Sequence, residues 1–253
     1  MTPIRLRDKF DAASTWLRRA SEGARASVFA LLVGLGVILA VPVLALVDNC
    51  DVNPTQSHCL ESENSSDDGS SPSPVGLTAI AAIGCSNTDL AVAGYLDQSE
   101  LDRLVNTAAG GETVERWANT TDNWEEHYLP NRPEDGFDAA WLNLCERARE
   151  GLSRENVVQQ LERIWELDPG IPVYISPLNF YAGEECRVTA GNQVSENGAA
   201  LADALVEEFD DVYRGPDLGP LGAGDLREDL CHPNQDGVAV LGAQLVDFFD
   251  STN

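Results

Sequence analysis

Residues 77–87 read LTAIAAIGCSN, a short apolar run that ends at Gly84 and is followed by Cys85 and Ser86. A continuous apolar run of this length, bounded by glycine, predicts a strand buried on both faces of a sheet. We expect a helix to follow it, with Ser86 at the strand-to-helix turn, because serine is favoured at the start of a helix. This stretch therefore predicts the strand and helix with which a parallel α/β sheet begins.

Further strands and helices alternate along the rest of the chain. Two more apolar runs predict buried strands, and three amphipathic stretches predict helices. The strands are expected at 137–145 and 171–178, and the helices at 153–167, about 199–209 and about 236–249. Ser153 is the expected N-cap of the first of these helices. The alternation predicts a three-layer α/β/α domain with a mostly parallel sheet over residues 76–253.

The N-terminal part of the chain has a different composition. Residues 27–47 contain no charged residue over about the ~20 positions that a helix needs to cross a membrane. Six basic residues lie in 1–26, and the first one after the apolar run is Arg103, so we expect a cytoplasmic leader and an extracytoplasmic domain. We interpret 27–47 as an uncleaved transmembrane signal anchor, with a cleaved signal peptide as the alternative. Residues 48–75 have little to bury and are predicted to be a Ser/Asp/Pro-rich tether.

The chain is strongly acidic, with 16 basic and 42 acidic residues and a formal net charge of −26. After residue 47 there are ten basic and 39 acidic residues. A negative field of this size repels nucleic acid and anionic lipid headgroups, so we expect no nucleic-acid partner. Contact with a membrane is expected only through the N-terminal helix.

Six cysteines lie after residue 47, in the compartment where disulfides persist. They are Cys50, Cys59, Cys85, Cys145, Cys186 and Cys231. Their number fits three bridges, but the sequence leaves fifteen pairings open. Cys50 and Cys59 would close a local loop. If the strands that lead to Cys85 and Cys145 are neighbours, these two could bridge, which leaves Cys186 for Cys231.

Two alternatives to this pairing stay open. Cys85 or Cys145 could be a buried free thiol, because a free cysteine packs like a small apolar residue. Zinc binding by Cys50, His58 and Cys59 would have only three ligands at poor spacing, so we expect no metal site.

Near the C-terminus the chain reads Asp229-Leu230-Cys231-His232-Pro233. An Asp three residues before a His can hold one ring nitrogen by a hydrogen bond and leave the other free to take a proton from a serine hydroxyl. Ser86 is the candidate nucleophile, because ligands bind at the carboxyl ends of strands in such sheets. Ser86, Asp229 and His232 together predict serine-based acyl transfer. A helix N-cap at Ser86 and a surface turn at His232 are the structural alternatives.

These two blocks resemble those of the SGNH or GDSL-like hydrolases, a superfamily of flavodoxin-like esterases, lipases and acetylesterases. IAAIGCSNT is similar to the family's strand followed by Gly-Asp-Ser, with Cys85 in place of the Asp and Ser86 at the nucleophile position. DLCHPNQDGVAVLGAQL is similar to its Asp-x-x-His-Pro block. The resemblance covers roughly 77–250 and implies an acyl-serine intermediate and no cofactor.

Two further blocks of the family supply oxyanion donors. For the glycine of the second block, NTAAGGETVERWA offers Gly111, with Gly110 as the fallback and a simple turn as the alternative. The third block, Gly-x-Asn-Asp, has no counterpart in WLNLCERAR. Aligning the strand ends puts Arg147 at the place of the Asn, as a donor to the oxyanion or to an anionic substrate group, with a solvated helix residue as the alternative. Asn143 is a second candidate, and the Ser86 amide is the remaining expected donor.

The resemblance implies a hydrolase of carboxylic esters with short-chain or carbohydrate-linked acyl groups, and the apolar segment 27–47 with its basic flank predicts that it is exported and membrane-anchored. Two other functions stay open. The missing third-block Asn and the Cys in the first block also fit a noncatalytic binding module. An acyltransferase that passes the acyl group to a carbohydrate hydroxyl would use the same residues.

Overall fold

The computed structural model describes residues 74, 76–183 and 186–251. Their centre is a five-stranded sheet in which every neighbouring pair is parallel. The strands are β1 (Ile80–Ile83), β2 (Leu104–Asn106), β3 (Ala139–Leu144), β4 (Val173–Pro177) and β5 (Val212–Arg214). Their spatial order, β2-β1-β3-β4-β5, is that of flavodoxin-like doubly wound sheets.

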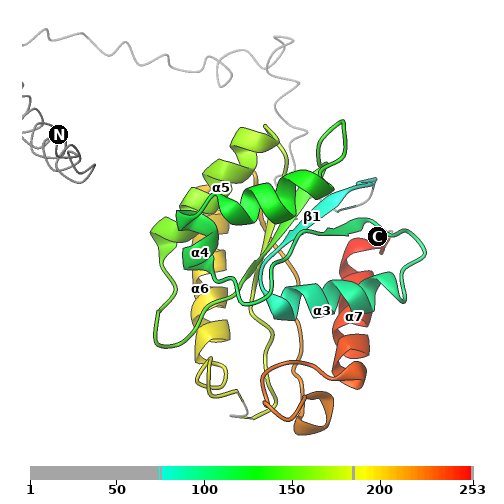
Figure 1. Ribbon diagram of the computed structural model, residues 1–253, viewed down its shortest axis with the longest axis vertical. Helices are drawn as coiled ribbons and strands as arrows, with labels where there is room; N and C mark the ends of the chain where they lie inside the picture. The colour runs from blue at the N-terminus through cyan, green and yellow to red at the C-terminus, as the bar shows by residue number, and fades with distance from the viewer. Residues whose placement is uncertain (1–73, 75, 184–185, 252–253) are drawn as a thin grey trace, which may run out of the picture. The chain divides into compact units, whose positions relative to one another are not determined.

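Helices cover both faces of this sheet, as Figure 1 shows. One face carries α3 (Ser86–Leu96) and α7 (Gln235–Phe249), which lie side by side. The other carries α4 (Val114–Asn119), α5 (Arg154–Leu167) and α6 (Gln193–Glu208). Short helical turns are η3 (Trp124–Tyr128), η4 (Leu129–Asn131) and η5 (Ala223–Asp225). The sheet and its two helix layers agree with the predicted three-layer class.

Two apolar cores lie on the two faces of the sheet. Ile80 and Ala82 pack with α3 and α7, whereas Ala81 and Ile83 pack with α4, α5 and α6. All four side chains are fully buried, which explains why β1 reads as a continuous apolar run. Close packing of α3 on α7 depends on glycine, because a Cβ on Gly242 would lie 2.2 Å from the Gly94 carbonyl carbon.

The observed elements are shorter or longer than the sequence pattern indicates. The three predicted strands contain β1, β3 and β4, and Ser153 caps α5 by accepting a hydrogen bond from the Asn156 amide. α6 begins at Gln193 rather than near 199. Its first turns were missed because small or polar residues occupy buried positions there, and such residues give no apolar stripe in the sequence. β2 and β5 were not predicted, since three residues are too few for a periodic signal.

The N-terminal predictions lie outside the described residues. These are the leader 1–26, the transmembrane segment 27–47, and nearly all of the tether 48–75 with Cys50, His58 and Cys59. Within the part of the chain that the structure describes, no helix is long and apolar enough to span a membrane.

Candidate active site

Ser86 directly follows the loop after β1, the strand on either side of which the chain adds strands in opposite directions. β1 pairs with β2 on one side and β3 on the other, so the loop after β1 opens at the topological switch point. Gly84 makes this turn possible, because a Cβ there would lie 2.1 Å from the Thr88 hydroxyl oxygen. That hydroxyl accepts a hydrogen bond from the Cys85 amide at 3.1 Å. The turn thus starts α3 with Ser86 as its first residue.

The structure brings Ser86, His232 and Asp229 into one hydrogen-bonded relay. Ser86 Oγ lies 2.8 Å from His232 Nε2, and His232 Nδ1 lies 2.6 Å from Asp229 Oδ2. An ionised carboxylate only accepts hydrogen bonds, so the Nδ1–H donates to Asp229. Nε2 is then the acceptor for the Ser86 hydroxyl. This is the arrangement that a serine nucleophile and its general base require.

The carboxylate of Asp229 is held by the chain that follows it. Oδ1 accepts hydrogen bonds from the amides of Cys231 and His232, both at 3.0 Å. Leu230, between Asp229 and Cys231, has φ +56°, a left-handed conformation that costs about 1–2 kcal/mol for a side chain of this type. Burial acts to raise the pKa of Asp229, but the hydrogen bonds from His232 and Cys231 outweigh it and lower the pKa to about 2. Asp229 is therefore ionised over the whole neutral range.

The two residues whose backbone amides are the candidate oxyanion donors, Ser86 and Gly111, both line one pocket. The Ser86 amide is in the first turn of α3, where N–H groups have no partner within the helix. Gly111 lines the same pocket with φ +81°, in a turn that the hydrogen bond from the Glu112 amide to the Ala109 carbonyl closes at 3.1 Å. Among the described residues, none accepts a hydrogen bond from the Gly111 amide. The fallback residue Gly110 is not among the described residues that line the pocket.

The two candidate side-chain donors have different positions. Asn143 is 3% exposed, donates to the Pro177 carbonyl at 2.6 Å, and accepts from the Thr88 hydroxyl at 2.9 Å. It is not among the described residues that line the pocket, because its side chain is buried in the interior and hydrogen-bonded to Pro177 and Thr88. Arg147 follows β3 and lines the pocket beside Ser86. Only Arg147 of these two is placed where a substrate could meet it.

Two disulfides flank the relay. Cys85 is bonded to Cys145 across the neighbouring strands β1 and β3, and Cys186 is bonded to Cys231. The Cα–Cα distances are 5.9 Å and 4.5 Å. One bridge thus precedes Ser86 by one residue, and the other precedes His232 by one residue. Each ties a loop that carries a member of the relay to a neighbouring loop.

Ser86 and His232 open into a pocket of about 750 Å³. This size is within the range of small-molecule sites. Its wall is formed by the loops after β1, β3 and β4 and by the turn at Gly111. Among the described residues, no group of three or more His, Cys, Asp or Glu side chains is placed to hold a metal ion.

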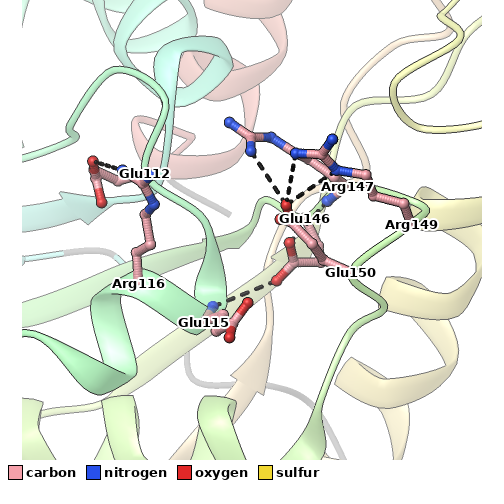
Figure 2. Close-up of polar contacts among 7 residues, drawn as sticks. All are labelled: Glu112, Glu115, Arg116, Glu146, Arg147, Arg149 and Glu150. Carbon is pink, nitrogen blue, oxygen red and sulfur yellow. Dashed lines mark hydrogen bonds and ion pairs between the residues drawn. The ribbon is translucent and has the colours of Figure 1, made fainter.

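Glu146 is a buried carboxyl in the wall of this pocket, 3% exposed. Its oxygens accept hydrogen bonds from the amides of Arg147 at 2.9 Å and Glu115 at 3.4 Å (Figure 2). Burial raises the pKa of Glu146 to about 7, because these hydrogen bonds oppose it only in part and the Glu150 carboxylate adds to it. Burial also acts to raise the pKa of Glu150, but bonds from Arg149 and Arg147 outweigh it and lower that pKa.

A Glu146→Gln variant should lose a pH dependence of stability that the parent shows. A folded-state pKa of about 7, against the ordinary 4.5, means that the folded protein binds more protons between these values. The free energy of unfolding of the parent therefore falls from pH 5 to pH 8, by on the order of 1–3 kcal/mol from this group, whereas glutamine stays neutral. Urea titrations at both pH values measure the difference. Glu126→Gln, at an exposed position, is the charge-matched control, and equal slopes in parent and Glu146→Gln would contradict the prediction.

If the relay catalyses acyl transfer, an Asp229→Asn variant should be about tenfold to hundredfold slower than the parent. The amide N–H can face Nδ1 of His232 and favour the tautomer whose Nε2 carries a proton, which cannot accept the proton of Ser86. The loss is limited because Asp229 is 49% exposed and water reaches the imidazole. The measurement is kcat/KM, with Asp247→Asn as the control, and an unchanged kcat/KM would contradict the role of Asp229.

The pH profile gives a second test of Asp229. Its depressed pKa means that its contribution to stability is complete above its ordinary value near 4 and is lost as the pH falls toward about 2. Between pH 5 and 9 Asp229 does not titrate. Any change of rate of the parent enzyme in that range should therefore come from other groups.

The chain was compared with known proteins. No family model matches it, and no curated protein does. Similar solved structures include a Bacteroides fragilis protein provisionally named an acylhydrolase, with 14% identity over 68% of this chain and 86% of that chain at a TM-score of 0.47. A Lactobacillus plantarum protein has 14% identity over 71% of this chain and 99% of that chain, at a TM-score of 0.45. A third is esterase EstA from Pseudoalteromonas sp., in a structure inhibited by monoethylphosphonate, with 14% identity over 68% of this chain and 97% of that chain, at a TM-score of 0.43.

The structure adds pocket residues that the sequence did not single out. Glu146, Arg149 and Arg187 all line the pocket with Ser86 and His232. A signal for one of them was present: if Cys186 pairs with the cysteine before His232, the next residue, Arg187, must lie near the histidine. Glu146 had no such signal, because only the fold shows that this position is buried.

Proposed function

We propose that this protein is a serine hydrolase of carboxylic esters, with Ser86 as nucleophile, His232 as general base and Asp229 as the group that orients it. The observation that carries this proposal is the relay of 2.8 Å and 2.6 Å from Ser86 through His232 to Asp229, open to a pocket of about 750 Å³. Its residues match the first and last blocks of the SGNH or GDSL-like hydrolases, to which we propose the chain belongs.

In the proposed reaction, Ser86 Oγ attacks the ester carbonyl carbon while its proton passes to His232 Nε2. The carbonyl oxygen becomes an oxyanion that accepts hydrogen bonds from the amides of Ser86 and Gly111. The imidazolium then gives its proton to the leaving alcohol, and the acyl group stays on Ser86. Water, deprotonated by the same histidine, releases the acid and restores the serine.

Covalent labelling with a fluorophosphonate tests the proposal directly, since it needs an activated serine but no knowledge of the natural ester. The full chain, oxidised and in non-ionic detergent, should be labelled at Ser86, as located by mass spectrometry of its peptides. It should also hydrolyse p-nitrophenyl acetate. Absence of both in folded protein would favour a noncatalytic binding module.

We also propose that the domain is exported and held at a membrane by residues 27–47, with residues 48–75 as a tether. The apolar run and its basic flank support the anchor. The two disulfides support an oxidising compartment. Carbonate extraction and protease accessibility in intact cells test both parts: a released or protected domain would contradict them.

A further inference from the structure

Three arginines line the pocket that contains Ser86 and His232: Arg147, Arg149 and Arg187. We propose that they bind an anionic group, a carboxylate or a phosphate, carried by the ester that Ser86 attacks. This inference rests on the proposed function, and it goes further by naming a chemical class of substrate and the residues that select it.

The arginines stand out against the charge of the chain. Ten arginines and no lysine follow residue 47, together with 39 acidic residues. Of the seven outside the pocket, five pair with carboxylates, and two donate to backbone carbonyls. The paired ones are Arg116, Arg132, Arg154, Arg163 and Arg214, and the other two are Arg103 and Arg227. The remaining three are in one pocket, where they create a local positive field in an acidic protein.

The cations in the pocket outnumber their carboxylate partners. Arg147 Nη1 and Arg149 Nη2 lie 3.2 Å and 3.1 Å from the same oxygen, Oε1 of Glu150 (Figure 2). Arg187 is exposed and, among the described residues, has no ion-pair partner. Glu150 thus pairs with two of the three guanidinium groups, and no other carboxylate among the described residues pairs with any of them.

Among the described residues, two further carboxyls line the pocket, and neither cancels this excess. Glu112 pairs with Arg116 at 3.0 Å and accepts from Asn123 at 3.0 Å. Glu146 is buried and carries its proton through part of the neutral range. Counted over the described lining residues, positive side chains thus exceed unpaired negative ones even with both carboxyls included.

The loops that carry the arginines meet beside the catalytic relay. The Ala148 amide donates to the Val188 carbonyl at 3.0 Å, so the segment from Arg147 to Arg149 runs next to Arg187. The bond from Cys186 to Cys231 then brings the Arg187 loop to the residue before His232. A molecule with its carbonyl carbon at Ser86 can therefore extend toward the arginines without leaving the pocket.

Guanidinium groups suit this task. Each presents several N–H donors in a planar fork that matches the oxygens of a carboxylate or phosphate. The side chains of Leu178 and Val188 line the pocket as well and supply apolar contact for the carbon chain between the two ends of the ligand. The expected ligand is a short ester with an anionic group at its far end.

The first test measures anion binding without catalysis. Isothermal titration calorimetry of the full-length Ser86→Ala protein, in non-ionic detergent at low salt, should show saturable binding of glutarate or inorganic phosphate. The better of the two tells which anion the pocket takes. Arg187→Gln in the same background should weaken that binding about tenfold, the loss of one charge-assisted contact. Arg154→Gln, which removes an equal charge far from the pocket, should not.

The second test asks whether the anion selects the ester. The protein with Ser86 intact should hydrolyse p-nitrophenyl hydrogen glutarate about tenfold faster, as kcat/KM, than its neutral methyl ester, and added salt should reduce that preference. Arg187→Gln should remove the preference, whereas Arg154→Gln, which lies outside the described residues that line the pocket, should keep it.

The outcomes separate the two proposals. Absence of saturable binding of both anions, or equal effects of Arg187→Gln and Arg154→Gln, would overturn the anion site. Equal rates on the two esters would overturn its role in substrate selection. Anion binding that is intact in a protein without esterase activity or fluorophosphonate labelling would overturn the serine-hydrolase proposal alone.

Discussion

Replacing Ser86 by alanine is expected to lower kcat/KM for p-nitrophenyl acetate at least about 10³-fold and to abolish fluorophosphonate labelling. The serine hydroxyl is the atom that becomes acylated, so no other group of the relay can substitute for it. Among the described residues, the Ser86 side chain makes one hydrogen bond, to His232 at 2.8 Å, and the backbone turn is held by Gly84 and Thr88. The variant should therefore fold as the parent does.

Ser153→Ala is the matched control, because it removes another serine at the start of a helix. Ser153 caps α5 and accepts from the Asn156 amide at 3.4 Å, away from the pocket. Its loss should lower the free energy of unfolding by about 0.5–2 kcal/mol and leave the rate unchanged. Esterase activity that survives in Ser86→Ala would show that another residue is the nucleophile.

Removal of either disulfide is expected to lower the free energy of unfolding by about 2–4 kcal/mol. The bridges close chain segments of 60 and 45 residues, so each restricts the unfolded chain considerably. The tests are the double variants Cys85→Ala/Cys145→Ala and Cys186→Ala/Cys231→Ala, unfolded in urea. Tryptophan fluorescence reports the transition, because Trp117, Trp124 and Trp141 are at most 2% exposed.

The same variants should lose activity under conditions in which they remain folded. Cys85 directly precedes Ser86, and Cys231 directly precedes His232. Opening either bridge should let the proposed catalytic residue beside it move, so that the 2.8 Å hydrogen bond between Ser86 and His232 is no longer maintained. Small misplacements of reacting groups lower rates steeply. Urea midpoints and kcat/KM equal to those of the parent would show that the bridges neither stabilise nor position the site.

Much of the fold was accessible from local patterns. β1, β3 and β4 are continuous apolar runs because they are buried on both faces, and α5 and α7 have an apolar stripe and a polar residue at the cap. α6 was only partly predicted, since its first turns use Ser195 and Gly198 where an apolar stripe would be expected. The edge strands β2 and β5 are defined by pairing with their neighbours and not by their own composition.

The sequence by itself determined the class of the domain and singled out Ser86, Asp229 and His232, because a strand-turn-helix unit and an Asp-x-x-His spacing are local features. Only the tertiary structure decided how distant segments meet. It buries Asn143 in the interior and leaves Arg147 at the pocket, although both are near the end of β3. It also brings Arg187 beside Arg149 and gives Glu146 a raised pKa. Which side chains are buried and which loops meet both depend on which strands are neighbours in the sheet. That order follows from the pairing of distant segments, so no local sequence pattern reveals it.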